Sequence, residues 1–420
     1  MISRTIVFVY LPGELVAVPA GELTLNEVGS EINSVFVYGK RYVERPNAIS
    51  LDPVSLDIRE VAGQHTIQPK NNLPLFGSFR DAAPDSWGRR VLEKEKNVVS
   101  LPEIEYLINA WDDRVGALDF REAPNSEAKK HPYNQILNLQ YLLDCADKIE
   151  NNEPVPANML RLFQYGSHMG GARPKAIVED DEGLWLAKFN SRGDHFTYSN
   201  VEKATLIMAK ACGLNVPDVK VVNIGTDSVF MIKRFDREKQ GSSYSRKHFV
   251  SALTMLGKDE MESPKSSYAE ICQAISKHCI ASEVKNMQIE LFRRMVMNIL
   301  VSNLDDHLRN HGFLHEQSGY VLSPAYDIVP TPQVGFERYQ HLGVGTQGRL
   351  STLDNALSSH HVFGLSEIDA VSIIKQMCEV VSHWRDFYSK EGVSDREISI
   401  LESAFRAPKD IGLDNLSSGT

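Results

Sequence analysis

The stretch NLDDHLRN, residues 303–310, places a carboxylate and a side-chain amide five residues apart. It follows an apolar stripe over residues 291–300, whose spacing is typical of one face of a helix. Phosphoryl transfer needs a carboxylate that orients the attacking hydroxyl and an amide oxygen near magnesium, and protein kinases hold the two at this same spacing. Asp305 and Asn310 therefore predict the catalytic loop of a phosphotransferase.

Other parts of a two-lobed kinase stand on both sides of this stretch, in the order in which a kinase uses them. They are a glycine-containing loop (166–171), a returning strand (184–189), a helix (199–212), two further strands (219–224 and 228–235) and a mainly helical remainder after 237. Lys188 ends the returning strand, outside the expected core, and Glu202 lies on the helix. Asp327 follows a short strand, where a kinase holds its metal-binding carboxylate. The order predicts a kinase-like fold, although the G-x-G-x-x-G pattern is absent.

The first third of the chain indicates short strands separated by turns. Residues 5–10 and 15–18, joined by a Pro-Gly turn, predict a hairpin, and residues 34–38 predict a further strand. We expect an α+β protein with a mixed α/β N-terminal part, built on a short-stranded sheet, and an all-helical C-terminal lobe. The expected domains are a β-rich N-terminal domain (1–125), a kinase N-lobe with the glycine-containing loop (126–237), a helical C-lobe (238–410) and a frayed tail (411–420).

Composition and charge argue against several classes of protein. Of 420 residues, 42% are apolar and 24% are charged, as in ordinary soluble globular proteins. Lys and Arg total 45 against 55 Asp and Glu, and the net charge of -10 argues against a surface dominated by nucleic-acid contacts. The N-terminal apolar run, residues 6–10, is far shorter than the roughly 20 residues of a membrane span. Five dispersed cysteines without a C-x-x-C pair fit a reducing compartment, so we expect a cytoplasmic protein with no membrane partner.

Each candidate residue also has an ordinary structural explanation. Lys188 could be a solvated strand residue, His307 a structural hydrogen-bonding group, and Glu202 the acidic member of an S-x-x-E capping box. The adjacent carboxylates of Asp305 and Asp306 are harder to explain in this way. They follow the C-terminal end of a helix, where the helix dipole disfavours negative charge, so we expect a compensating cation, and magnesium would serve.

Four motifs occur in a fixed order along the chain. They are GGARPKA (170–176), RFDR (234–237), DDHLRN (305–310) and PAYD (324–327). Together they resemble the HipA family, serine/threonine kinases that act as toxins of bacterial toxin–antitoxin modules. The segment RVGAL (114–118) is similar to the end of the family's N-terminal domain, so the resemblance covers nearly the whole chain.

The resemblance implies a site for ATP and Mg²⁺ and gives a role to each matching residue. Lys188 would contact the nucleotide phosphates, and Asp305 would be the base that orients the substrate hydroxyl. The phosphate-side loop would comprise Gly170, Gly171, Ala172, Arg173, Pro174 and Lys175. The adenine-binding linker would comprise Lys233, Arg234 and Phe235. The residues beside the nucleotide would be His307, Asn310 and Tyr326, and those on Mg²⁺ would be Asn310 and Asp327.

Two positions depart from the family pattern. Lys233 stands where the linker is often acidic, which keeps backbone contacts to adenine but removes a side-chain acceptor. The loop serine that the family autophosphorylates, counted back from Lys175, falls on His168, and Ser167 lies one residue earlier. Ser167 is the candidate for autophosphorylation, because a phosphate in this loop would repel ATP. The alternative is that His168 has replaced the acceptor and no such switch exists.

By this resemblance the protein transfers the γ-phosphate of ATP to a protein hydroxyl, on an aminoacyl-tRNA synthetase or another translation factor, and arrests growth. A helix-turn-helix antitoxin would neutralise the toxic activity, and the protein would contact DNA mainly through this antitoxin. Two alternatives stay open: a non-catalytic co-repressor that acts as a scaffold for the antitoxin, and a small-molecule or lipid-type kinase, because the D-x-H-x-x-N form is also similar to phosphoinositide kinases. The sequence shows no polybasic run, which argues against a lipid substrate. It carries no signature of the target, the antitoxin or the oligomeric state.

Overall fold

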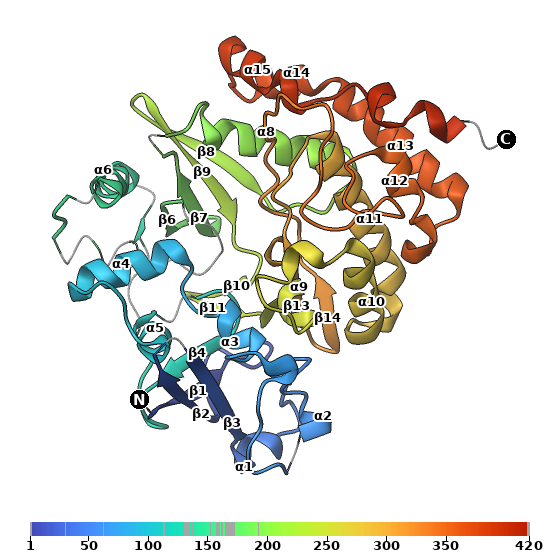
Figure 1. The fold of residues 1–420 in the computed structure, drawn as a ribbon. Coiled ribbons are helices and arrows are strands. Elements are labelled where there is room, and N and C mark those ends of the chain that lie inside the picture. Colours follow the sequence, from blue (N-terminus) through green and yellow to red (C-terminus); the bar gives the residue numbers. More distant parts are fainter. Residues whose placement is uncertain are drawn as a thin grey trace.

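The computed structural model describes residues 2–29, 31–61, 63–111, 114–129, 134–135, 138–151, 153–156, 160, 163, 173–191 and 193–417. Figure 1 shows an N-terminal sheet with short helices, a second sheet beside a long helix, and a helical part formed by most of the C-terminal half. The α+β class expected from the sequence is confirmed. Among the described residues, no helix combines the length and the apolar character needed to cross a membrane.

The N-terminal domain is built on a four-stranded antiparallel sheet in the order β3-β2-β1-β4. The strands are β1 (Ile2–Val9), β2 (Val18–Val28), β3 (Glu31–Tyr38) and β4 (Leu118–Arg121). The predicted hairpin is confirmed, with Val9 opposite Val18. Its second strand begins only at Val18, and Val16 is exposed in the turn. The helices of this domain are α1 (Lys40–Val43), α2 (Ile58–Val61), α3 (Gly77–Asp81), α4 (Ser86–Lys96) and α5 (Glu103–Asn109).

The second sheet has five strands in the order β5-β6-β7-β9-β8. They are β5 (Asn134–Gln135), β6 (Lys175–Asp180), β7 (Gly183–Phe189), β8 (Val219–Ile224) and β9 (Asp227–Lys233). Successive side chains alternate between the two faces, as the pleat of a strand requires. Ile177 and Leu186 share a core with helix α8 (Tyr198–Ala211), whereas Val178 and Trp185 share one with α4 and with α6 (Leu139–Glu150). We call this sheet with α8 and α6 the N-lobe.

Helix α8 begins differently from the prediction. Its N-cap residue is Thr197, whose side chain makes no capping hydrogen bond. The Ser199 hydroxyl instead donates to the Ser228 carbonyl oxygen at 2.9 Å, and Glu202 pairs with Lys188. The predicted capping box is therefore wrong, because both of its side chains have partners elsewhere in the N-lobe.

The C-terminal half, which we call the C-lobe, is mainly helical. Its helices are α9 (Ala252–Met255), α10 (Tyr268–His278), α11 (Val284–Leu300), α12 (Leu353–Leu357), α13 (Glu367–Ser382), α14 (Trp384–Lys390) and α15 (Asp395–Leu401). The expectation of an all-helical lobe is wrong. The lobe also holds the sheet β12 (Phe249–Ser251), β13 (Gly312–Glu316) and β14 (Gly319–Leu322) and the hairpin β10 (Arg237–Gln240) and β11 (Ser243–Arg246). Phe249 pairs with Leu314, a contact between distant segments that leaves no local pattern in the sequence.

The last residues of the chain are packed rather than frayed. Residues 408–411 and 414–417 form short 3-10 turns, and the side chains of Ile411 and Leu416 are buried in the core of the C-lobe. The expected tail is therefore wrong for residues 411–417, because these apolar side chains lose contact with water on packing. Residues 418–420 lie outside the described residues.

Candidate active site

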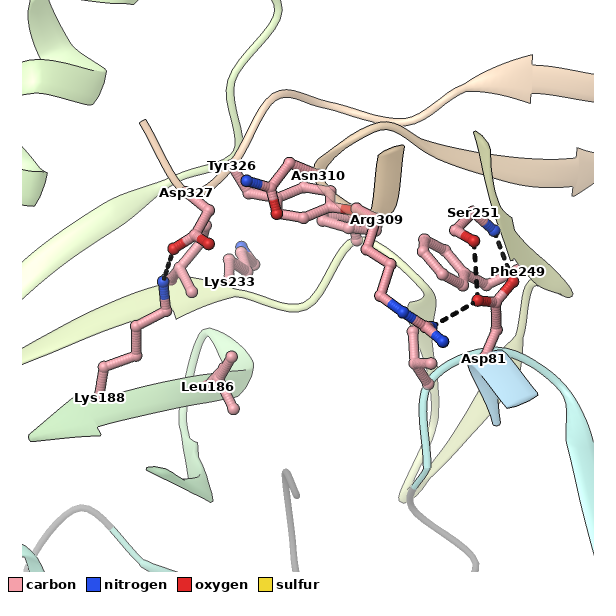
Figure 2. A pocket seen from close by; sticks show the side chains of 13 residues that line it. Asp81, Leu186, Lys188, Lys233, Phe249, Ser251, Arg309, Asn310, Tyr326 and Asp327 are labelled. Atoms are coloured by element: carbon pink, nitrogen blue, oxygen red, sulfur yellow. Dashed lines mark hydrogen bonds and ion pairs between the residues drawn. The ribbon is translucent and has the colours of Figure 1, made fainter. Parts of the chain in front are cut away.

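A cavity lies between the N-lobe, the C-lobe and the N-terminal domain, as Figure 2 shows. The lining residues are Asp81, Val115, Leu186, Lys188, Ile232, Lys233, Phe235, Phe249, Ser251, Arg309, Asn310, Tyr326 and Asp327. Six of the residues predicted from the sequence are thus brought together: Lys188, Lys233, Phe235, Asn310, Tyr326 and Asp327.

Lys188, near the end of β7, lies between two carboxylates. Its Nζ is 2.6 Å from Oε1 of Glu202, which is buried on α8, and 3.0 Å from Oδ1 of Asp327. Burial alone would lower the pKa of Lys188, but the two carboxylates outweigh it and raise that pKa. Burial raises the pKa of Glu202, whereas Lys188 holds the pKa of Asp327, a partly exposed carboxylate, below its usual value. The lysine is therefore a fixed cation at the wall of the cavity.

Asp327 has a backbone conformation that is uncommon for a residue with a Cβ. Its φ is +59°, in the left-handed region that a residue with a Cβ rarely adopts. Ser302, just after α11, also has a positive φ of +51°. Asn303 joins the two segments, because its Nδ2 donates to the Asp327 carbonyl oxygen at 3.4 Å. Such strained residues cluster at functional sites, where the surrounding structure holds them in place.

The segment predicted as the catalytic loop follows α11 and contains two different carboxylates. Asp305 is exposed. Asp306 is buried and accepts hydrogen bonds from the Tyr268 hydroxyl and, at 2.9 Å, from Nε2 of His311. Burial would raise the pKa of Asp306, but His311 and its other partners lower it overall. We expected magnesium to compensate the negative charge of Asp305 and Asp306. The charge of Asp306 is already stabilised within the protein, by the hydrogen bonds from Tyr268 and His311.

Asn310 lines the cavity at the end of this loop. Its Nδ2 donates to the Asp305 carbonyl oxygen at 3.1 Å, which leaves the amide oxygen of Asn310 for another partner. His307, by contrast, packs edge-on against His341 and is not among the side chains lining the cavity. The structure therefore places the side chain of Asn310 at the cavity and that of His307 outside its lining, near enough to Asp327 to affect the pKa of that carboxyl.

The linker between the lobes contributes less backbone to the cavity than expected. The N–H of Lys233 donates to the Asp218 carbonyl oxygen at 2.9 Å, and the N–H of Arg234 donates to the Leu184 carbonyl oxygen at 2.9 Å. These two N–H groups are therefore engaged within the protein, and the expected backbone contacts to adenine stay a prediction for the other backbone groups of the linker. The ring of Phe235 lines the cavity and stacks on Tyr326 at 5.7 Å between centroids.

The RFDR motif forms a buried ion cluster. Asp236 is fully buried, at 2.7 Å from Nη2 of Arg234 and 2.6 Å from Nη1 of Arg237. Burial would raise the pKa of Asp236, but the two guanidinium groups lower it well below its usual value. The cluster also binds the N-terminal domain, because the Gly116 N–H donates to Asp236 at 2.8 Å. The side chain of Arg234 therefore holds the linker in place and is not among those lining the cavity.

The predicted phosphate-side loop is described only from residue 173 onward. Arg173 pairs with Asp194 at 2.6 Å, Pro174 is buried, and Lys175 pairs with Asp85 at 2.6 Å. None of these three side chains is among those lining the cavity. The remaining residues predicted here, which are Ser167, Gly170, Gly171 and Ala172, lie outside the described residues.

A family model described as the HipA-like C-terminal domain matches residues 167–384, more than half of the chain. This chain belongs to the HipA family. The resemblance found in its four motifs is therefore confirmed. The matched region contains Lys188, Glu202, Asn310 and Asp327, so the cavity lies largely within the family's own domain.

Named members of the HipA family and related kinases are similar to parts of this chain. A candidate kinase of Haemophilus influenzae is 28% identical over 195 residues, which cover 41% of this chain and 55% of that one. A candidate kinase of Sinorhizobium fredii is 24% identical over 231 residues, covering 51% and 54%. The serine/threonine-protein kinase toxin HipA of Shewanella oneidensis is 25% identical over 142 residues, covering 30% and 33%. The chain thus spans about half the length of the first two relatives.

The fold of HipA itself matches that of this chain over almost its whole length. The solved complex of Shewanella oneidensis HipA with HipB and its operator DNA superposes with a TM-score of 0.71 at 16% identity, covering 98% of this chain and 100% of that chain. The two-lobed kinase-like fold expected from the sequence is therefore confirmed.

Sequence reasoning missed several residues that line the cavity of this HipA-family chain. Asp81 comes from helix α3 of the N-terminal domain, and Ser251 and Phe249 come from β12. No local pattern marks them, because they reach the cavity through long-range packing. Arg309 lies in the stretch 303–310. Its positive charge next to Asn310 was the one feature of the sequence that could have indicated a residue of the cavity.

The side chains at the cavity fit a magnesium ion bound together with phosphates. Asp327 offers a carboxylate and Asn310 an amide oxygen, and Mg²⁺ in nucleotide sites usually takes one or two carboxylates plus phosphate oxygens. Within the described residues, no three His, Cys, Asp or Glu side chains converge on one point. With one carboxylate and one amide oxygen, Asp327 and Asn310 would leave the remaining ligand positions of Mg²⁺ to phosphate oxygens and water.

Proposed function

We propose that this protein is an ATP-dependent kinase that transfers the γ-phosphate of ATP to a serine or threonine hydroxyl of another protein. The observation that carries the proposal is Lys188, held between Glu202 and Asp327 at the wall of the cavity. In protein kinases a lysine on a strand of the N-lobe pairs with a helix glutamate and contacts the phosphates. The kinase names of the relatives support the same reaction.

Each residue has a role that follows from its position. Lys188 would hold the nucleotide phosphates, and Leu186, Ile232 and Phe235 would enclose the base between apolar side chains. The exposed carboxylate of Asp305 would orient the substrate hydroxyl and accept its proton. Asn310 and Asp327 would bind Mg²⁺, which when bound would neutralise charge on the phosphates.

The partners belong to the same proposal. The matching complex of Shewanella HipA contains HipB and operator DNA, which supports a helix-turn-helix antitoxin and contact with DNA through it. A translation factor such as an aminoacyl-tRNA synthetase as substrate and growth arrest rest on the family resemblance, and a cytoplasmic location rests on the dispersed cysteines. The complete Lys188–Glu202–Asp327 arrangement favours catalysis over a purely non-catalytic co-repressor, and no cavity residue favours a lipid substrate.

The test is a transfer assay with the purified full-length chain. Incubation with Mg-ATP labelled at the γ-phosphate and a generic protein substrate is expected to place label on serine or threonine, and isothermal titration is expected to show ATP binding. Withdrawal of Mg²⁺ by EDTA is expected to stop the transfer. A chain that binds no ATP and transfers no phosphate would refute the proposal.

Autophosphorylation of Ser167 is a further expected result. A phosphate adds about -1.5 to -2 charge at neutral pH and would repel the phosphates of ATP from its loop. After incubation with Mg-ATP, mass spectrometry is expected to find phosphate on Ser167 in the wild type and none in Asp305→Asn. An unmodified loop in a protein that phosphorylates other substrates would show that His168 has replaced the acceptor and that the switch is absent.

A further inference from the structure

A short segment of the N-terminal domain contacts both lobes. Its C-lobe attachment is Asp81, the last residue of α3, whose carboxylate is buried. Oδ2 of Asp81 accepts from the Ser251 N–H and the Thr254 hydroxyl, each at 2.7 Å, and Oδ1 accepts from the Ser251 hydroxyl at 2.7 Å and from Nη1 of Arg309 at 3.0 Å. Four donors of the C-lobe therefore hold this one carboxylate.

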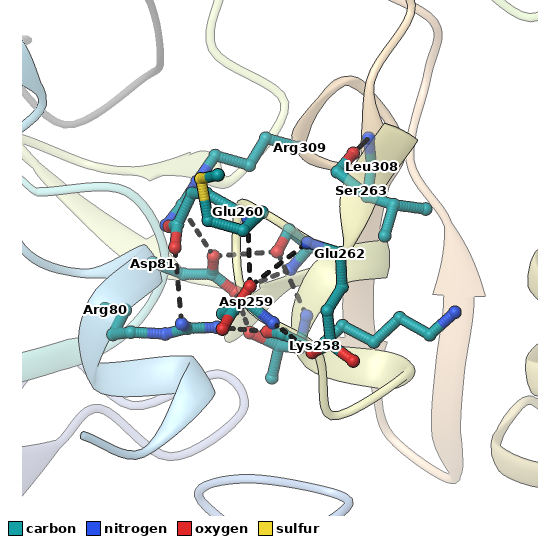
Figure 3. A network of polar contacts seen from close by, with 12 residues as sticks. Arg80, Asp81, Lys258, Asp259, Glu260, Glu262, Ser263, Leu308 and Arg309 are labelled. Atoms are coloured by element: carbon teal, nitrogen blue, oxygen red, sulfur yellow. Dashed lines mark hydrogen bonds and ion pairs between the residues drawn. The ribbon is translucent and has the colours of Figure 1, made fainter. Parts of the chain in front are cut away.

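The neighbouring Arg80 strengthens the attachment to the C-lobe, as Figure 3 shows. Its Nη2 donates to the Lys258 carbonyl oxygen at 2.5 Å, and its Nη1 is 3.4 Å from Glu260, which also pairs with Arg309. The carbonyl oxygen of Arg309 in turn accepts from the Tyr326 hydroxyl at 2.7 Å. The N-terminal domain is thereby joined to the loop that ends at Asn310 and to the residue before Asp327.

The same segment reaches the N-lobe four residues later. Asp85 is the N-cap of α4: one of its oxygens accepts from the Gly88 N–H at 2.9 Å, and the other from Nζ of Lys175 at 2.6 Å. Lys175 is buried on β6 and lies directly opposite Lys188 on β7. Helix α4 continues the contact, because Trp87 belongs to the core on the outer face of the N-lobe sheet.

The segment between the two attachments is short and buried. Ala82, Ala83 and Pro84 are all buried, and the proline ring restricts the backbone. Four residues span at most about 13 Å when fully extended. The lobes cannot move far apart on this side unless the contacts of Asp81, or those of Asp85 and of α4 with the N-lobe sheet, break or loosen.

The opposite side of the N-lobe is fixed by different contacts. The hydroxyls of Thr205 on α8 and Tyr388 on α14 are 2.6 Å apart, and Lys203 pairs with Glu391 at 2.7 Å. Two-lobed enzymes open by rotation about a few connecting residues. With α8 fixed to the C-lobe, the side left to open is the one crossed by residues 80–85.

We propose that residues 80–85 form a strap that holds the two lobes at their working distance, with Asp81 and Asp85 as positioning residues for the cavity. Neither carboxylate has to touch the nucleotide in this role. The strap sets how far Lys188, on the N-lobe, lies from Asn310 and Asp327, on the C-lobe. Its effect on nucleotide exchange rests on the proposed function, whereas its effect on the distance between the lobes does not.

The decisive variant is Asp85→Asn, with Glu103→Gln as its matched control. Asparagine is as good an N-cap as aspartate, so α4 keeps its start while the charge opposite Lys175 is lost. Glu103 pairs with Arg89 at 2.6 Å and joins α4 to α5 without touching the strands of either lobe. The control therefore removes an equally short ion pair that does not hold the lobes together.

The first measurement is the distance between the lobes without nucleotide. Spin labels on the exposed residues Asp181 of the N-lobe and Lys265 of the C-lobe allow it to be read by pulsed electron resonance. Wild type and Glu103→Gln are expected to give one narrow distribution, and Asp85→Asn a broader one at longer distance. Identical distributions in all three proteins would overturn the strap.

A second variant tests the strap in case Asp85→Asn does not fold. Three glycines inserted between Ala83 and Pro84 keep both attachments and lengthen the strap by about 10 Å. The insertion is expected to lengthen the distance in the same way, and an unchanged distribution would overturn the strap.

The second measurement is the release of a fluorescent ATP analogue. Release from Asp85→Asn and from the insertion variant is expected to be about tenfold faster than from wild type and Glu103→Gln. Release at the wild-type rate in both would overturn the positioning role. If the wild type binds no ATP analogue, the proposed function fails, and the distance measurement still tests the strap by itself.

Discussion

Asp305→Asn is expected to lower the rate of phosphoryl transfer by about 10²- to 10⁴-fold, the usual contribution of a positioned acid–base group, with ATP affinity unchanged. The substitution keeps the shape of the side chain but removes its ability to accept the proton of the substrate hydroxyl. Because Asp305 is exposed, its loss is expected to leave the melting temperature at the wild-type value. Steady-state kinetics, ATP titration and thermal denaturation on one preparation measure the three quantities.

Asp306→Asn is the matched contrast, one residue further along the chain. Its carboxylate is buried against Tyr268 and His311, so we expect a lower melting temperature from this variant. Catalysis by Asp305 would be contradicted if Asp305→Asn kept wild-type kcat, or if it lost activity only in proportion to a loss of folded protein.

Lys188→Met is expected to abolish transfer and also to destabilise the protein by about 3–5 kcal/mol, the usual cost of removing one partner of a buried ion pair. Glu202 is 1% exposed and would lose its cation. The position of Lys188 at a strand end suggested a residue outside the core, but its ammonium group, largely shielded from water, pairs with the buried Glu202. Urea denaturation and ATP titration of the variant measure the two effects.

The double variant Lys188→Met with Glu202→Gln separates stability from function. Removing both charges is expected to restore most of the lost stability, because no uncompensated carboxylate stays buried. ATP binding and transfer are expected to stay lost, since the phosphates would still lack their cation. A double variant that regained wild-type transfer would show that Lys188 serves the fold alone.

Local spacing was enough to predict much of this fold. The hairpin of β1 and β2, the strands β6 to β9 and the end of α8 depend on neighbouring residues and on alternation, which a sequence displays directly. Asp305 and Asn310 were paired by their five-residue spacing, and the structure links them through the hydrogen bond from the Asn310 side chain to the Asp305 carbonyl oxygen. A contact within one short loop can be predicted because the covalent chain itself keeps its members close.

Only the tertiary structure decided which charges meet. Lys188 and Asp327 are 139 residues apart, and Arg309 and Asp81 are 228 residues apart. The pairing of Glu202 with Lys188 rather than with its own helix start, and of Asp236 with Arg234 and Arg237, depended on the same packing. Buried charges must find partners because burial removes them from water. Which partner they find depends on how distant segments pack, and such segments share no period or spacing that a sequence could display.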